Sequence, residues 1–231
     1  MMRMLAVTHG PTVRPELFGD VIVSEGHELV EWPIDARGRP PASGYDGVFV
    51  FGGHQNVGEE VEHPWLHEEY DALRRWVDDG TPLFAVCLGA QTLAHALGGS
   101  VTRVEPAQLA GFYETTLTDE GAADPVLGVL PRRFEALNAN GYQFTVPSGG
   151  VPLADGPVAQ AFFAGDAAWG VQFHPEARRD QALAWFADDD PPRRPLPELE
   201  RELDEGLPAW QEHGRRLCSA FLAVAGGRSP G

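Results

Sequence analysis

The sequence predicts an α/β fold with three layers, in which helices cover both faces of a mainly parallel central sheet. Short apolar runs alternate with amphipathic helical patterns over about the first 100 residues, which favours parallel strands joined by crossover helices. After that point, short stretches with a period of two predict a second half that is richer in strands. The length of 231 residues suits one large domain with a substantial core.

The elements of the first half follow in chain order. Each predicted strand is a run of apolar residues, and each predicted helix has apolar residues three and four positions apart, as Leu66, Tyr70 and Leu73 are. Glycine and prolines at 37–41 predict a loop. The predicted strands are 4–8, 27–32, 48–51 and 82–86, and the predicted helices are 16–25, 65–79 and the segment directly after Cys87.

The second half is richer in predicted strands, which are 101–104, 112–117, 134–137, 158–163 and 168–173. A charged, proline-rich stretch at 187–197 then divides a main domain, 1–187, from a helical extension, 188–231. Apolar residues at helical spacing predict one or two helices in the extension, with a break at 206–208. We expect it to pack on the same domain, with a docking arm for a partner subunit as the alternative, and its end, 226–231, to be disordered.

Charge and composition exclude several classes of partner. The 34 acidic residues outnumber the 17 basic ones and give a net charge of −17, so we expect neither nucleic acid nor a membrane as a partner. Two cysteines are too few for a disulfide scaffold, and an active thiol needs a reducing compartment. The apolar N-terminal run is too short for a signal peptide and no run reaches transmembrane length, which predicts a cytoplasmic protein.

Cys87 is the strongest candidate for chemistry. It follows the apolar run 82–86 and precedes a helical pattern, so it lies at a sharp turn and at a helix N-terminus. Unpaired N–H groups and the helix dipole favour the thiolate there. Gly89 suits the turn because little room is left beside it. The pattern is typical of a nucleophile elbow with sulfur in place of oxygen, and the alternative is a small buried core residue.

A second segment, WGVQFHPE at 169–176, favours the catalytic interpretation. His174 ends a predicted strand, and residues two apart in an extended chain point to the same side, so Glu176 can lie beside it. Pro175 fixes the backbone between them. A carboxylate beside an imidazole fixes its tautomer and stabilises the imidazolium, which a Cys–His pair requires. A lone histidine at a strand end would more often be a polar rim residue.

Three segments together resemble the class I, or triad-type, glutamine amidotransferases. They are VFVFGGHQNVGEE at 48–60, PLFAVCLGAQTLAHALGG at 82–99 and WGVQFHPE at 169–176. The resemblance covers roughly residues 4–187 and implies a flavodoxin-like sheet with a small added antiparallel patch. It also implies a Cys87–His174–Glu176 triad that hydrolyses the side-chain amide of glutamine, and no cofactor. It is nearest to the free-standing, GMP-synthase-like branch, in which the glutaminase domain is a separate chain.

Acyl transfer from an amide passes through a tetrahedral oxyanion, which N–H groups must stabilise. One N–H should be that of Leu88, directly after the nucleophile. The second should come from Gly52 or Gly53, because glycine lets the backbone approach the substrate closely, although a plain turn after the strand is the alternative. The resemblance also implies that Gln91 contacts bound glutamine, and a solvated or helix-capping glutamine is the alternative.

Two positions depart from the family's pattern. Ala85 stands where the family commonly has glycine, which is a small change. In NANGYQF at 138–144, related proteins often carry His-x-His-Gly-Asp-x-Phe beside the glutamine pocket, so Tyr142 replaces an aspartate that would face the α-amino end of the substrate. We assign Gly141 and Tyr142 to substrate binding. We expect no metal site, because no third ligand completes the histidines spaced by four at 63 and 67.

The sequence thus predicts a hydrolase that cleaves the γ-amide of glutamine or a γ-glutamyl group through a Cys87 thioester. It contains no P-loop and leaves no room for a synthase domain. Ammonia would therefore pass to a separate synthase subunit, or the chain would act alone as a γ-glutamyl peptidase or hydrolase. A non-catalytic regulatory relative is a third hypothesis, which the intact triad disfavours. Fold analogy does not separate the first two.

Overall fold

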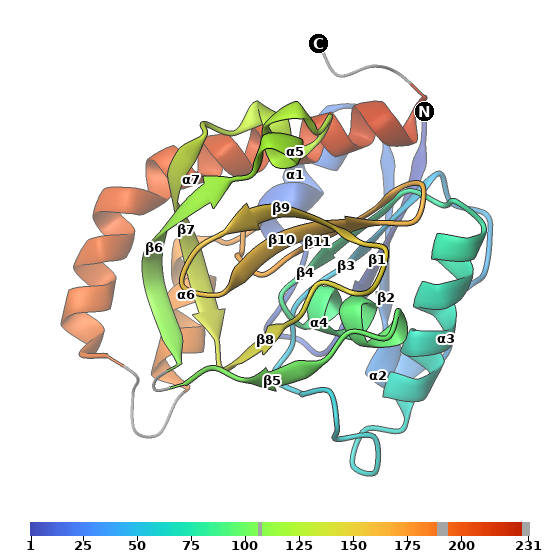
Figure 1. Ribbon diagram of the computed structural model, residues 1–231, viewed down its shortest axis with the longest axis horizontal. Coiled ribbons are helices and arrows are strands. Elements are labelled where there is room, and N and C mark those ends of the chain that lie inside the picture. Colours follow the sequence, from blue (N-terminus) through green and yellow to red (C-terminus); the bar gives the residue numbers. More distant parts are fainter. Residues whose placement is uncertain (106–107, 189–193, 228–231) are drawn as a thin grey trace.

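The computed structural model describes residues 1–105, 108–188 and 194–227. Within these residues a nine-stranded sheet has the strand order β2-β1-β3-β4-β11-β10-β9-β6-β7, and helices lie on both of its faces (Figure 1). A two-stranded sheet, β5-β8, lies beside it. The predicted α/β fold with three layers is confirmed.

The parallel half of the sheet carries the candidate site. Its described strands, in chain order, are β1 (Arg3–Thr8), β2 (Glu28–Pro33), β3 (Gly47–Val50), β4 (Leu83–Val86) and β11 (Ala168–Val171). Successive side chains of a strand point to opposite faces. In β3, Phe49 packs into one core while Val48 and Val50 pack into the other. The apolar runs therefore suit a sheet that is buried on both faces.

The other half of the sheet is antiparallel and larger than the small patch that the sequence predicted. Its described strands are β10 (Ala159–Ala164), β9 (Val151–Asp155), β6 (Leu109–Leu117) and β7 (Arg133–Asn140), while β5 (Val101–Arg103) pairs with β8 (Tyr142–Phe144). The sequence did not predict β8 and β9. Only three residues form β8, and Pro152 interrupts the strand pattern of β9 because proline has no N–H to donate.

Helices from distant parts of the chain cover each face (Figure 1). One core packs against α1 (Glu16–Ser24), α6 (Arg179–Ala187) and α7 (Leu196–Ala225), and the other packs against α2 (Ile34–Arg37), α3 (Trp65–Asp78) and α4 (Leu88–Ala96). The short α5 (Asp119–Ala123) contacts β9, and η1 (Leu127–Val129) contacts α7. The sequence did not predict α2, α5 and α6, because two are very short and the apolar residues of α6 do not gather on one side.

An aromatic cluster joins α1 and α7 to the sheet. Phe49 of β3 lies 5.6 Å from Phe18 of α1 and 4.8 Å from Phe221 of α7, measured between ring centroids. Phe84 of β4 completes the cluster at 5.9 Å from Phe18 and 5.6 Å from Phe221. All four rings are fully buried, and edge-to-face contacts add to the free energy gained from burying their area. The cluster fixes both helices against the strands that lead to the site.

The C-terminal helix α7 is continuous, so the predicted break at 206–208 is wrong. Pro208 is exposed in its middle and lacks the N–H that would bond one turn back. Leu203, Leu207 and Trp210 are buried on its inner side, and this packing continues past the proline. α7 lies against α1, α6, β6 and β7. Parts of the predicted linker and disordered end, 189–193 and 228–231, lie outside the described residues.

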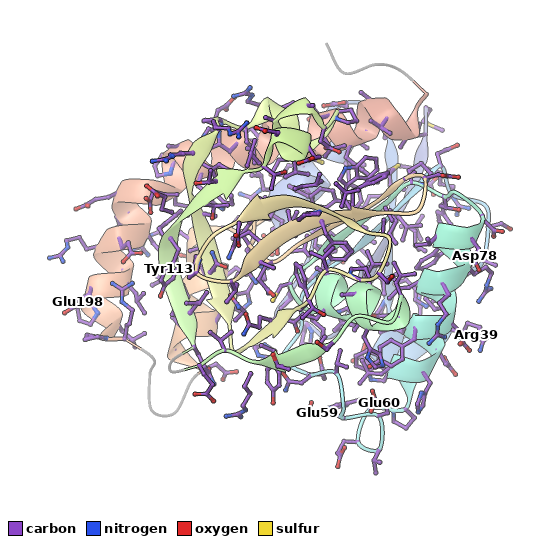
Figure 2. The ribbon with its side chains drawn as sticks, in the orientation of Figure 1. Arg39, Glu59, Glu60, Asp78, Tyr113 and Glu198 are labelled. Carbon is purple, nitrogen blue, oxygen red and sulfur yellow. The ribbon has the colours of Figure 1, made fainter. Side chains whose placement is uncertain are left out.

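Glu69 and Glu176 are buried, whereas other charged side chains lie on the outside of the molecule. Arg39, Asp78 and Glu198 are exposed and project from its periphery (Figure 2). No helix among the described residues is both long and apolar enough to cross a lipid bilayer.

The topology brings three segments to one edge of the sheet. Strands β3, β4 and β11 are neighbours and parallel, so their carboxyl ends lie at the same edge. The chain beyond these ends carries Gly52, Cys87 and His174. Ligand sites of open α/β sheets form at this edge.

Gly214 lies where α7 crosses the chain beyond β11, and its replacement tests this packing. A Cβ at Gly214 would lie 2.1 Å from the carbonyl oxygen of Pro175. We expect Gly214→Ala to lower the free energy of unfolding by about 1–3 kcal/mol, because overpacking against backbone outweighs the better helix propensity of alanine. Urea denaturation measures the change. The control, Glu212→Ala at an exposed position of α7, should stay within about 0.5 kcal/mol of the parent. An unchanged or raised midpoint for Gly214→Ala would contradict the packing.

Candidate active site at the edge of the parallel strands

A cavity of about 300 Å³ lies at the carboxyl edge of the parallel strands. Most of its lining side chains are polar. Those from the predicted site are Gly53, Cys87, Leu88, Gln91, Gly141, Tyr142 and His174, and those that the sequence analysis did not assign include His54, Arg103, Gln108, Trp185 and Asp188. Segments that are far apart in the sequence thus meet around the cysteine.

Cys87 lies at the sharp strand-to-helix turn that the sequence predicted. Its φ is 51° and its ψ is −109°, a backbone conformation that is rare for a residue with a side chain. The N–H of Cys87 donates to the carbonyl oxygen of Val171 at 2.8 Å. A Cβ at Gly89 would lie 2.3 Å from the carbonyl oxygen of Val50, so only glycine allows α4 to start this close to β3. The turn places the thiol at the N-terminus of α4.

His174 and Glu176 form a buried pair beside Cys87. The distance from His174 Nδ1 to Glu176 Oε1 is 2.8 Å. Burial by itself lowers the pKa of His174, but the charges of Glu176 and Cys87 and hydrogen bonds to both outweigh it and raise this pKa to about 10. The imidazolium therefore persists well above neutral pH. Its positive charge lies beside the Cys87 sulfur, as in a catalytic Cys–His pair.

The backbone of His174 is fixed from two sides. Its N–H donates to the carbonyl oxygen of Leu137 at 2.9 Å, and its carbonyl oxygen accepts from Trp210 Nε1 at 2.8 Å. The predicted strand 168–173 ends earlier, at Val171, so these bonds, and not a strand ladder, hold His174 beside Glu176. On the cavity side, the Trp185 ring lies 4.4 Å from the imidazole between centroids.

The three predicted oxyanion-hole residues lie around Cys87. Leu88 is the first residue of α4, so its N–H has no acceptor within the helix. A Cβ at Gly52 would lie 3.1 Å from His174 Cε1, and one at Gly53 would lie 2.7 Å from Leu88 Cδ2. Both glycines therefore let this loop lie directly against the cysteine turn.

Of the predicted substrate residues that line the cavity, Gln91 lies on α4, Tyr142 is the first residue of β8 and Gly141 directly precedes it. The Gln91 Nε2 donates to the carbonyl oxygen of Tyr142 at 3.0 Å and to Gln172 Oε1 at 3.3 Å. Gly141 packs against the Gln108 side chain. These contacts tie α4 to β8 behind the cavity.

Arg103 and Asp188 are charged lining residues that the sequence analysis did not assign. The Arg103 guanidinium lies 5.6 Å from the centre of the Tyr142 ring, and its Nε donates to the Tyr142 hydroxyl at 3.3 Å. Asp188 Oδ2 lies 3.7 Å from His54 Nδ1. Both residues come from segments without a strong pattern, the end of a short strand and a charged stretch after α6. Within the described residues, no group of three or more His, Cys, Asp or Glu side chains could hold a metal ion.

The family model for class-I glutamine amidotransferases matches residues 20–186 of this chain. The chain belongs to this family. The match spans all three segments that carried the resemblance, which is therefore confirmed.

Curated relatives of this glutamine amidotransferase include long synthases and a shorter protein. The chain is 30% identical over 181 residues to the glutamine-hydrolyzing GMP synthase of Thermotoga maritima, a match that covers 77% of the chain and 33% of the synthase. It is 28% identical over 163 residues to the glutamine amidotransferase-like protein chyE of Penicillium rubens, covering 68% of the chain and 66% of that protein. The chain thus spans about a third of the GMP synthase.

Solved structures share the fold of this glutamine amidotransferase at low sequence identity. A glutamine amidotransferase from Thermotoga maritima gives a TM-score of 0.85 at 20% identity and covers 97% of both chains. A glutamine amidotransferase from Methylobacillus flagellatus also gives 0.85 at 20% identity, covering 96% of this chain and 94% of that one. The structural likeness includes α7, which lies beyond the residues matched by the family model. At this sequence identity the likeness shows the fold alone.

The two cysteines differ in a way that alkylation can measure. Cys218 is fully buried in α7, where burial raises the pKa of its thiol well above the usual value. Cys87 lines the cavity beside His174. We expect iodoacetamide at pH 7 to label Cys87 roughly tenfold faster or more, because the thiolate is the reactive form. Peptide mass spectrometry measures the two rates, and Cys87→Ala is the control. Equal labelling in the folded protein would contradict the activated thiol.

Proposed function

We propose that this chain hydrolyses the γ-amide of glutamine, or of a γ-glutamyl group, through a thioester on Cys87 and releases ammonia or an amine. The observation that carries the proposal is the arrangement at the cavity, where Cys87 lies at a helix N-terminus beside a His174–Glu176 pair at 2.8 Å. A nucleophile, a base within reach and a group that orients the base are the parts that covalent acyl transfer requires.

In the first step, the Cys87 sulfur attacks the γ-carbonyl carbon and the carbonyl electron pair moves to oxygen. The N–H groups of Leu88 and the Gly52–Gly53 loop stabilise that oxyanion. When the oxyanion collapses, the C–N bond breaks and the departing nitrogen takes a proton from His174, which leaves the γ-glutamyl thioester. Glu176 orients the imidazole and stabilises its protonated form throughout.

In the second step, His174 accepts a proton from water as the water oxygen attacks the thioester carbonyl. The second oxyanion collapses and expels the Cys87 thiolate, which releases glutamate. His174 is then protonated again, as at the start. No group outside this chain and water is consumed.

Two opposite charges support an amino-acid substrate. A free γ-glutamyl group carries an α-carboxylate and an α-ammonium, and the cavity is lined by both a cation, Arg103, and an anion, Asp188. We assign the α-carboxylate to Arg103 and the α-ammonium to Asp188. Asp188 then supplies the negative charge that the loop at 138–144 lacks because of Tyr142.

The Arg103–Tyr142 pair favours a second candidate, a stand-alone γ-glutamyl peptidase. Tyr142, with the Arg103 guanidinium over its ring face, stands where related proteins often carry an aspartate, and this altered loop suits a γ-glutamyl donor other than free glutamine. For the amidotransferase role, the support is the match to GMP synthases, of which this chain spans a third. In that role a synthase on a separate chain would take up the ammonia.

Release of glutamate by the purified chain, from glutamine and from γ-glutamyl peptides, tests the proposal. We expect Cys87→Ala to abolish hydrolysis and His174→Ala to lower it roughly 10³-fold or more, because no other base faces the sulfur. Glu176→Gln should retain more activity than His174→Ala, since glutamine still bonds the imidazole but does not stabilise its charge. Hydrolysis by Cys87→Ala would contradict the thioester. Equal loss in the other two variants would show that orienting the base is too weak a description of Glu176.

The charge assignment predicts a substrate-dependent loss. We expect Arg103→Gln to lower kcat/KM about tenfold for glutamine but little for glutamine α-amide, which has no α-carboxylate. Asp188→Asn should lower it for glutamine but not for N-acetylglutamine, which has no α-ammonium. Steady-state kinetics on the three donors measure both, with Arg39→Gln as the control at an exposed position. The assignment would be contradicted if Arg103→Gln lost as much kcat/KM on glutamine α-amide as on glutamine. It would also be contradicted if Asp188→Asn lost as much on N-acetylglutamine as on glutamine.

A further inference from the structure

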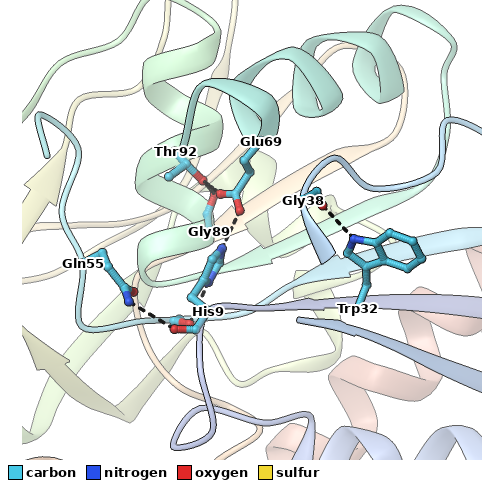
Figure 3. A network of polar contacts seen from close by, with 8 residues as sticks. His9, Trp32, Gly38, Gln55, Glu69, Gly89 and Thr92 are labelled. Atoms are coloured by element: carbon cyan, nitrogen blue, oxygen red, sulfur yellow. Dashed lines mark hydrogen bonds and ion pairs between the residues drawn. The ribbon is translucent and has the colours of Figure 1, made fainter. Parts of the chain in front are cut away.

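A second buried histidine–carboxylate pair lies outside the candidate triad. His9 follows β1 and Glu69 lies on the inner side of α3, and the solvent reaches neither side chain. His9 Nε2 and Glu69 Oε2 are 2.5 Å apart (Figure 3). Burying two ionisable groups requires several kcal/mol of desolvation, and an apolar pair would often be as stable. The pair therefore needs a reason beyond packing.

The other side of the His9 ring faces the loop that contains Gly52 and Gly53, which we call the glycine loop. His9 Nδ1 lies 2.9 Å from the carbonyl oxygen of Gly52. A carbonyl oxygen can only accept, so Nδ1 must carry a proton. Burial lowers the pKa of His9, but the charge and hydrogen bond of Glu69 and the bond to Gly52 outweigh it and raise that pKa. The Trp65 ring stacks on the imidazole at 5.2 Å. Glu69 thus favours the protonated imidazole, and the Trp65 ring holds it in place.

This bond fixes the direction of the next N–H. In a trans peptide the carbonyl and the following N–H point in opposite directions. The Gly52 carbonyl is held toward His9, so the Gly53 N–H points away from His9, and Gly53 itself lines the cavity. A flipped peptide would instead direct the Gly52 carbonyl dipole at the place where the oxyanion forms, and would destabilise it.

The chain of contacts continues to the start of α4. Thr92 Oγ1 lies 2.7 Å from Glu69 Oε1 and 3.0 Å from the carbonyl oxygen of Gly89 (Figure 3). Gly89 follows Leu88, whose N–H is the other candidate oxyanion donor. A single buried network therefore joins the two segments that supply these donors.

We propose that His9, held by Glu69 and Thr92, is a positioning residue that keeps the Gly52–Gly53 peptide in the orientation that forms the oxyanion hole. The inference rests on the proposed function, because it assigns a role in that reaction. His9 contacts no reacting atom and acts through the peptide.

The double variant His9→Leu/Glu69→Met tests the role, because it removes the donor to Gly52 without leaving a buried unpaired charge. We expect kcat on the best donor to fall about 10²-fold, the loss typical of one oxyanion donor, while KM changes less than about threefold. Alkylation of Cys87 by iodoacetamide should stay within about twofold of the parent rate, because displacement at a saturated carbon forms no oxyanion. A purely structural role would lower both rates together.

The matched control is His9→Asn/Glu69→Gln, in which the asparagine amide can still donate to Gly52. It should retain kcat within about tenfold of the parent. Unchanged kcat in His9→Leu/Glu69→Met, parallel loss of turnover and alkylation, or equal loss in both double variants would overturn the inference.

Crystal structures of the two double variants decide the inference even if the parent chain hydrolyses no donor, an outcome that would defeat the proposed function alone. A flipped Gly52–Gly53 peptide in His9→Leu/Glu69→Met, and the parent orientation in His9→Asn/Glu69→Gln, would support the role of His9. An unflipped peptide in both variants would overturn it.

Discussion

The close approach of α4 to β3 is the constraint on which the site depends. The first turn of α4 packs on the end of β3 only because Gly89 has no Cβ to meet the Val50 carbonyl. The chain must then reverse sharply at Cys87, whose positive φ typically costs about 1–3 kcal/mol. The fully buried apolar residues of β4 and α4 offset that strain. As a result, the thiol leaves the sheet at a helix N-terminus, with the Leu88 N–H beside it.

The parts that meet Cys87 are held from opposite faces of the sheet. On one face, α7 crosses the chain beyond β11, and Trp210 of this helix bonds the His174 carbonyl. On the other face, α3 reaches the glycine loop through Glu69 and His9. In both places a buried carboxylate pairs with a histidine, and the histidine is bonded to another segment, His174 to Trp210 of α7 and His9 to the Gly52 carbonyl. The C-terminal helix thus contacts the segment that carries His174.

The sequence predicted those features that depend on near neighbours. The strand, cysteine, glycine and helix of the turn are consecutive, and His174 and Glu176 are two residues apart, so local periodicity and turn chemistry were sufficient. Arg103, Trp185 and Asp188 reach the cavity only through tertiary packing of short or weakly patterned segments. His9 and Glu69 are 60 residues apart, although an acidic residue on the apolar side of the predicted helix 65–79 was an available signal. The continuity of α7 also depends on packing, which overrides the local effect of Pro208.

The thioester on Cys87 is the central claim of this account, and mass spectrometry of the acid-quenched protein tests it most directly. During turnover of a γ-glutamyl donor, a fraction of the chain should gain the mass of one γ-glutamyl group, and fragmentation should place it on the peptide that contains Cys87. Hydroxylamine, which cleaves thioesters, should remove it. Hydrolysis of the donor with the added group on another residue, or with a group that resists hydroxylamine, would contradict the account.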